Sequence, residues 1–89
     1  MRRGEFTEDN EGTQEIRLRV TYDSSVNAAY IYFVDSIGPG ESKRQRACEC
    51  PDDGTIIFDF DEFGRVLGLE VLNADRSLRP ETLAEAERL

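Results

Sequence analysis

The stretch TIIFDFDEFGRVLGLEVL, residues 55–72, decides the fold because it contains two alternating segments around a short turn. The first segment carries large apolar residues at alternate positions, namely Ile56, Phe58 and Phe60. The second carries a similar set, Leu67, Leu69 and Val71. Successive side chains of a strand point to opposite faces, so these patterns predict strands over residues 55–61 and 65–72. The intervening Asp61-Glu62-Phe63-Gly64 is short enough for a hairpin turn in which Gly64 takes a positive φ.

Three further strands are predicted upstream of this hairpin. Residues 15–21 alternate apolar side chains with Arg17 and Arg19, which is typical of a half-buried strand. Residues 28–34, AAYIYFV, are apolar on both faces and predict a central strand covered on both sides, by a helix or by a second subunit. Residues 43–50 are polar at nearly every position, which favours a strand at the sheet edge, where charge resists edge-to-edge pairing.

The end of the chain predicts a short helix over residues 80–89. Pro80 suits its first position, because that position leaves its amide unbonded in any helix. Its apolar stripe consists of Leu83, Ala86 and Leu89. The predicted fold is therefore α+β, with one antiparallel sheet of four to five strands in meander order and one C-terminal helix packed on the sheet. Residues 1–14 are polar without a period, so we expect a disordered arm followed by a single domain over residues 15–89.

Composition and charge exclude several functional classes. Of the 89 residues, 38% are hydrophobic, so the core is small and a homodimer that shares an apolar face would enlarge it. The net charge of −8 argues against nucleic-acid binding through a basic surface. The absence of histidine excludes the triads, zinc sites and general bases built on that residue. No apolar run is long enough for a membrane span and no signal peptide is recognisable, so we expect no membrane association and a cytoplasmic location.

Three segments, VTYD at 20–23, AAYIY at 28–32 and DFDEFGRVLGLEVL at 59–72, resemble a small prokaryotic family, domain of unknown function 2283 (DUF2283). The resemblance covers residues 16–84. Two positions depart from the family pattern, since Asn27 stands where Asp is common and Ala29 where Leu is common. The resemblance implies a compact, intracellular α+β domain from bacteria or archaea, with no assigned activity. By analogy with small proteins encoded beside ribonuclease-like toxins, it also suggests an antitoxin role.

Residues 59–70 carry the residue spacing of an EF-hand calcium loop, with Phe63 in place of one oxygen ligand. The flanking segments are predicted strands and not the two helices of an EF-hand, so a structural hairpin is the favoured interpretation. A weak cation site that uses Asp59, Asp61 and Glu70 stays open. In an apolar strand, Glu70 is otherwise expected to face solvent or to pair with a base such as Arg17 or Arg19.

Three other groups of residues are candidates for chemistry. An acid–base set of Tyr22, Asp23, Tyr30 and Tyr32 is less favoured than packed tyrosines and a turn-capping aspartate. Cys48 and Cys50 are expected to be free thiols, or else half of a zinc site shared across a dimer axis. The basic residues are expected to pair with the acids Asp59, Asp61 and Glu70 in preference to forming a nucleic-acid patch. They are Arg17, Arg19, Lys43, Arg44 and Arg46.

These observations favour a non-enzymatic protein-interaction module that forms a homodimer, with no catalytic residue, cofactor or metal. Two alternatives remain open. One is the metal-dependent site described above. The other is an antitoxin-like partner of a basic ribonuclease-type toxin, in which carboxylates around two turns would cover the phosphate-binding surface of the toxin. Those carboxylates are Asp52, Asp53, Asp59, Asp61 and Glu62.

Overall fold

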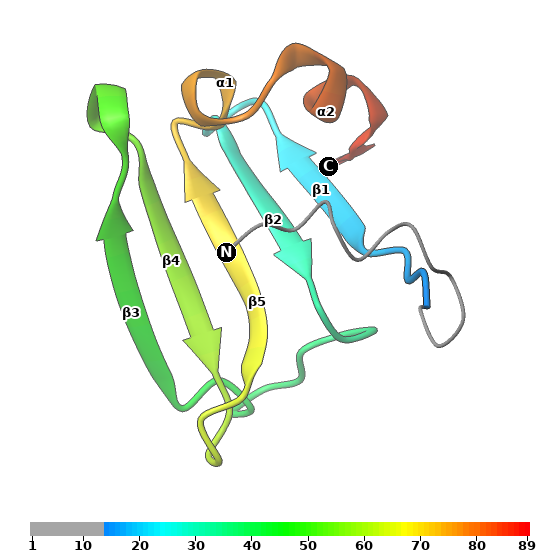
Figure 1. The fold of residues 1–89 in the computed structure, drawn as a ribbon, viewed down its shortest axis with the longest axis vertical. Coiled ribbons are helices and arrows are strands. Elements are labelled where there is room, and N and C mark those ends of the chain that lie inside the picture. Colours follow the sequence, from blue (N-terminus) through cyan, green and yellow to red (C-terminus); the bar gives the residue numbers. More distant parts are fainter. Residues whose placement is uncertain (1–13) are drawn as a thin grey trace.

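The computed structural model, which describes residues 14–89, contains one six-stranded sheet with two short helices at one end (Figure 1). The strand order across the sheet is β3-β4-β5-β2-β1-β6. The strands are β1 (Arg19–Asp23), β2 (Ala28–Tyr32), β3 (Arg44–Glu49), β4 (Thr55–Phe60), β5 (Val66–Leu72) and β6 (Glu87–Arg88). The helices are α1 (Ala74–Ser77) and α2 (Pro80–Glu85). The α+β class is confirmed, whereas the predicted disordered arm falls almost wholly on residues outside the described range.

The five strands predicted from the sequence are all present. Four of them have slightly shorter bounds, whereas the strand predicted over residues 15–21 is shifted and lies at residues 19–23 as β1. β2 lies between β5 and β1 in the interior of the sheet, as its two-sided apolar pattern indicates. β3 lies at one edge, and each of its six residues is exposed. The turn between β4 and β5 is the predicted hairpin, with Gly64 at a φ of 80°. The amide of Gly64 bonds to the carbonyl of Asp61 at 3.0 Å and closes the turn.

The predicted meander order is wrong, because β2 pairs with β5 and not with β3. The segment 33–43 carries the chain past β5 and β4 to the far edge (Figure 1). The observed order sets Ala29 beside Val71 and Ile31 beside Leu69. Apolar side chains therefore adjoin one another in the middle of the sheet, while the polar β3 stays at the edge, where its side chains remain in water.

The prediction of one C-terminal helix over residues 80–89 is also wrong. α2 begins at Pro80 as expected but ends at Glu85, and Ala86 is extended with φ −72° and ψ 152°. Glu87 and Arg88 then form β6, which pairs with β1 in parallel, so the sheet is mixed. The amide of Leu89 bonds to the carbonyl of Tyr22 at 3.1 Å. Residues 87–89 thus form hydrogen bonds with the backbone of β1, whose outer edge would otherwise be unpaired. A helix that continued to residue 89 could not form these bonds.

The main hydrophobic cluster lies on one face of the sheet, here called the helix face, near one end, and Leu67 is buried apart from it toward the other end of β5. The upper row of this face consists of Tyr22, Ala29, Val71 and Ile56 on four neighbouring strands. Ala74 of α1 and Leu83 of α2 pack with this row in the main buried cluster. The lower row consists of Val20, Ile31, Leu69 and Phe58, and all four of its side chains are only half-buried. The helices therefore complete the core over one row and leave the next row partly in water.

No helix in the described part of the chain combines the length and the apolar character needed to cross a membrane.

Candidate functional site

The opposite face of the sheet, here called the tyrosine face, carries a buried carboxylate that is held by side chains from other parts of the chain. Asp59 of β4 is only 7% exposed. Its Oδ2 accepts a hydrogen bond from the hydroxyl of Tyr30 on β2 at 2.5 Å. Its Oδ1 accepts hydrogen bonds from Gln45 on β3 at 2.7 Å and from Ser42, just before β3, at 3.0 Å. Three donors therefore compensate the cost of burying this charge.

Tyr30 reaches Asp59 by crossing Gly68 of β5, which lies between their two strands. A Cβ atom at Gly68 would lie 2.5 Å from the Tyr30 ring and 2.7 Å from the carbonyl oxygen of Ile31. Only glycine therefore allows the ring to lie flat across this strand. Tyr32 packs against Tyr30 with ring centroids 4.6 Å apart, and the guanidinium of Arg19 lies 4.4 Å from the Tyr32 ring centroid. The tyrosine face is thus a continuous polar and aromatic network across the sheet.

The environment moves the pKa values of Asp59 and Tyr30 in opposite directions. Burial disfavours the charged carboxylate of Asp59, but the hydrogen bonds from Tyr30, Gln45 and Ser42 outweigh it and lower the pKa. Burial, followed by the hydrogen bond to the Asp59 carboxylate, raises the pKa of Tyr30. Asp59 is therefore a stable anion at neutral pH and Tyr30 a stable neutral donor. A general acid or base works best with a pKa close to the working pH, so both groups are moved away from that role.

The candidate acid–base residues do not form one site, because the sheet separates their side chains onto opposite faces. Tyr22 points to the helix face, where its hydroxyl donates to Oδ1 of Asn27 at 3.1 Å, whereas Tyr30 and Tyr32 lie on the tyrosine face. Asp23 accepts hydrogen bonds from the amide and the hydroxyl of Ser25. Its carboxylate therefore caps the turn between β1 and β2, as the turn chemistry of the sequence indicates.

The three metal candidates Asp59, Asp61 and Glu70 are not brought together. The Asp61 carboxylate stabilises the hairpin turn by accepting from the amides of Phe63 and Arg65 and from the Arg65 side chain. The Arg65 amide is the largest of the causes that lower the pKa of Asp61. Glu70 lies on β5 beside Tyr30 and forms no ion pair with Arg17 or Arg19 in the described chain. Within residues 14–89, no group of three potential ligands surrounds a common point.

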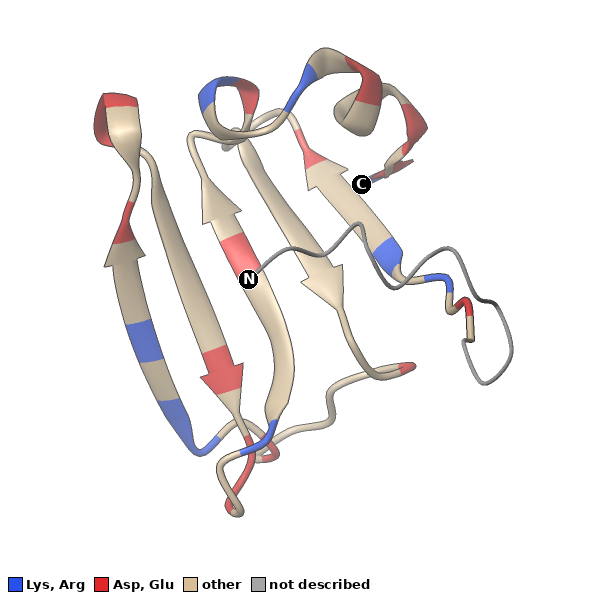
Figure 2. Ribbon diagram, viewed as in Figure 1, with Lys and Arg blue, Asp and Glu red and all other residues tan. Residues whose placement is uncertain are grey.

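The charged side chains do not gather as the sequence suggested. Arg19 and the pair Arg44 and Arg46 lie on strands at opposite sides of the sheet, and none of them pairs with Asp59, Asp61 or Glu70. The turn acids are divided too, because Asp52 and Asp53 precede β4 whereas Asp61 and Glu62 follow it, so the two pairs lie at opposite ends of that strand. Figure 2 shows acidic residues at both ends of the β3–β4–β5 unit. The single acidic surface that the antitoxin-like alternative requires is not formed.

Asn27, one of the two departures from the family pattern, has a structural role. Its φ is 55°, a left-handed conformation that asparagine tolerates better than most residues. Its Oδ1 accepts from the Asp75 amide at 3.1 Å, and its Nδ2 donates to Oδ1 of Asp75 at 2.7 Å. Asn27 thus fastens the β1–β2 turn to α1. An aspartate here would set two carboxylates against each other, which explains the amide in this chain.

Sequence reasoning missed three members of the Asp59 network: Ser42, Gln45 and Gly68. Gln45 and Ser42 sit in polar surroundings, where nothing marks them as partners of a residue more than a dozen positions away. Gly68 did offer a signal, since a glycine inside an apolar strand indicates a close approach by another group.

Comparisons with known proteins place the chain in a family without assigning it an activity. Searches of curated proteins and of solved structures find no match. A family described as "Protein of unknown function (DUF2283)" matches residues 19–74, somewhat less than the resemblance at 16–84. The matched span includes β1 to β5 and so contains the whole Asp59 network. The chain therefore belongs to the DUF2283 family.

Proposed function

We propose that this protein is a non-enzymatic interaction module in which two copies associate through the lower row of the helix face. The observation that carries the proposal is the half-burial of the entire lower row, next to an upper row in which every residue except Ile56 is buried. Apolar residues continue below it. Phe33, whose amide bonds to the carbonyl of Leu67 at 3.0 Å, is 45% exposed, and Leu18, just before β1, is 41% exposed.

The small core of the single chain supports this proposal. Seven hydrophobic residues of the described chain are buried, and three of them are alanines: Ala29, Ala74 and Ala86. A domain of this size has little stability to spare, so covering a further apolar row would add substantially to it. An interface that uses the same patch on both copies closes after two subunits, which predicts a dimer and not an open assembly.

The non-enzymatic part of the proposal is supported by the chemistry of the tyrosine face. Its best-placed ionisable groups, Asp59 and Tyr30, have pKa values moved away from neutrality, and the carboxylate oxygens already accept three hydrogen bonds. No observation favours the metal-dependent or antitoxin-like alternative, because the residues that each requires lie apart.

Sedimentation equilibrium over a dilution series tests the self-association. We expect twice the chain mass at micromolar concentration for the native sequence and a monomer for Phe33→Asp, because a charge at this position would be desolvated in the interface. Phe63→Asp is the matched control, since Phe63 is 69% exposed at the hairpin tip and should leave the dimer intact. A native protein that stays monomeric at every concentration would contradict the proposal.

A further inference from the structure

The outer edge of β3 carries backbone groups that face away from the sheet. The amide of Cys50 bonds to the carbonyl of Gly54 at 2.8 Å, and alternation from this bond makes Arg44, Arg46 and Cys48 the residues of β3 that bond to β4. Antiparallel pairing alternates along a strand, so the backbone groups of Gln45, Ala47 and Glu49 face outward. Nothing in the described chain pairs with this edge, since β3 is the first strand of the sheet order. An edge of this kind is a template for a further strand.

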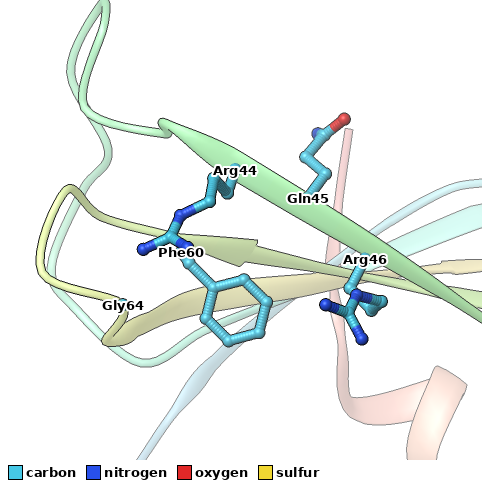
Figure 3. Close-up of a pocket in the computed structure, with 5 residues that line it drawn as sticks. All are labelled: Arg44, Gln45, Arg46, Phe60 and Gly64. Atoms are coloured by element: carbon cyan, nitrogen blue, oxygen red, sulfur yellow. The ribbon is translucent and has the colours of Figure 1, made fainter.

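Two arginines stand beside that edge on the helix face. Arg44 lies opposite Phe60 and Arg46 opposite Phe58 in the pairing with β4. Together with Gly64 they border a hollow of about 330 Å³, and Figure 3 shows both guanidinium groups on the same side of the sheet as the Phe60 ring. Side chains two positions apart on a strand share a face, so they present two positive charges in a row.

Neither arginine has a carboxylate partner among residues 14–89. The ion pairs of this part of the chain are Arg19–Glu87, Arg65–Asp61 and Arg79–Glu81. Cation–π contacts also engage other arginines, namely Arg19, Arg65 and Arg88. The chain is acidic overall, with 19 acidic and 11 basic residues. Two neighbouring arginines on one face, neither paired with a carboxylate in the described structure, therefore form a local positive patch on an otherwise negative protein.

The opposite edge of the same sheet shows how such an edge is completed. There β6 pairs with β1, and Glu87 of β6 is 3.1 Å from Arg19 of β1. A short extended segment thus supplies backbone pairing and a carboxylate for the arginine of the neighbouring strand. The edge at β3 likewise needs a strand to pair with its backbone and a carboxylate for each of its two arginines. No segment of residues 14–89 supplies either.

We propose that the β3 edge binds an extended acidic segment of a partner protein, which adds as a further strand and directs alternate carboxylates at Arg44 and Arg46. A second copy of β3 does not fit. Antiparallel pairing about a two-fold axis keeps both helix faces on one side, so it would gather four arginines there. A nucleic acid fits less well, because it would leave the outward backbone groups unpaired and would meet a net charge of −8. This site lies at the edge of the sheet and does not depend on the proposed dimer.

Binding of a fluorescent peptide that alternates valine and glutamate, followed by anisotropy, tests the proposal. We expect the Arg44→Glu, Arg46→Glu double variant to weaken binding at least about tenfold, and added salt to weaken binding to the native protein. Arg79→Glu, an exposed change of the same sign, should leave the affinity within about twofold. A peptide isomer with valines and glutamates in pairs should bind less tightly, because its carboxylates face both sides of a strand.

A backbone variant separates strand addition from simple charge attraction. Ala47→Pro removes an outward amide while leaving the bonds to β4, so it should abolish peptide binding with little change in melting temperature. If Ala47→Pro lowers the melting temperature strongly, the double arginine variant and the peptide isomer decide the question. Equal binding of both peptide isomers, an equal loss with Arg79→Glu, or tighter binding of single-stranded RNA than of the peptide would overturn the proposal. Sedimentation of the double variant shows separately whether the dimer persists.

Discussion

The two faces of this sheet are built from alternate residues of the same strands, yet they are held together by different forces. The upper row of the helix face is apolar, and its residues other than the half-buried Ile56 are buried together with residues of α1 and α2. The tyrosine face is held by hydrogen bonds that converge on Asp59. Apolar burial has no preferred direction and tolerates many side chains of similar size, whereas the hydrogen-bonded network needs particular atoms at particular distances.

This difference predicts how each face responds to substitution. The helix face should lose stability in proportion to the apolar volume removed. The tyrosine face should be sensitive to changes of a single atom or proton, because the buried carboxylate depends on its three donors. Four measurements, ordered from the largest expected effect to the smallest, would test the distinction.

Gly68→Ala should be the most damaging change, at about 3 kcal/mol of unfolding free energy. The new methyl would lie against the Tyr30 ring and 2.7 Å from the backbone oxygen of Ile31, which cannot move without separating β2 from β5. Denaturant unfolding measures the loss. Gly38→Ala is the control, since its Cβ would meet only the Glu41 side chain at ordinary contact distance. Similar stability of the two variants would show that Tyr30 does not cross Gly68 as described.

Val71→Ala should cost about 2 kcal/mol by opening a cavity in the upper row, because Val71 is 1% exposed. Val26→Ala removes the same atoms at a position that is 66% exposed and should change the unfolding free energy by less than about 0.5 kcal/mol. Denaturant unfolding of both variants gives the comparison. An equal cost at the two positions would mean that the helices do not bury this row.

Tyr30→Phe should cost about 1.5 kcal/mol, because it removes one donor from a buried carboxylate and almost no volume. Tyr32→Phe makes the same chemical change where the hydroxyl has no hydrogen-bond partner among the described residues, and it should be nearly neutral. Thermal unfolding of the two variants at neutral pH distinguishes them. If Tyr32→Phe were the more damaging, aromatic packing would hold this face and not the hydrogen bond.

The smallest expected effect is a dependence on pH that only the tyrosine face shows. The pKa of Asp59 is lowered in the folded state, so its stabilising contribution is present above the ordinary value of 3.8 and is lost as pH falls through the folded pKa. The stability difference between the native protein and Asp59→Asn should therefore shrink as the solution becomes more acidic than about pH 4. Asp61 is present in both proteins, so its own lowered pKa cancels from the difference.

The cost of Val71→Ala, measured by denaturant unfolding over the same pH range, should stay constant. A difference for Asp59→Asn that stays equally constant would mean that Asp59 titrates alike in the folded and unfolded states. The comparison needs no absolute stability, because each variant is measured against the native protein at the same pH.

Local sequence signals predicted the elements that depend on local physics. Gly64 marked the hairpin because a short turn needs one residue at positive φ, and Pro80 marked the first residue of α2 because its ring fits there. The polar character of β3 placed it at an edge, and the two-sided apolar pattern of β2 placed it inside the sheet. For Gly64 and Pro80 the deciding interaction is the local backbone conformation. For β3 and β2 it is whether their side chains are exposed to water or buried.

The tertiary structure alone decided which strands adjoin and which side chains meet across them. The pairing of β2 with β5 joins segments about 40 residues apart, and the Tyr30–Asp59 hydrogen bond depends on that pairing and on Gly68 between them. The same holds for β6, which takes its place because β1 had an open edge and not because Glu87 and Arg88 favour a strand. Alternation along one segment fixes the two faces of a strand, but the order of strands depends on the energy of the whole packed sheet.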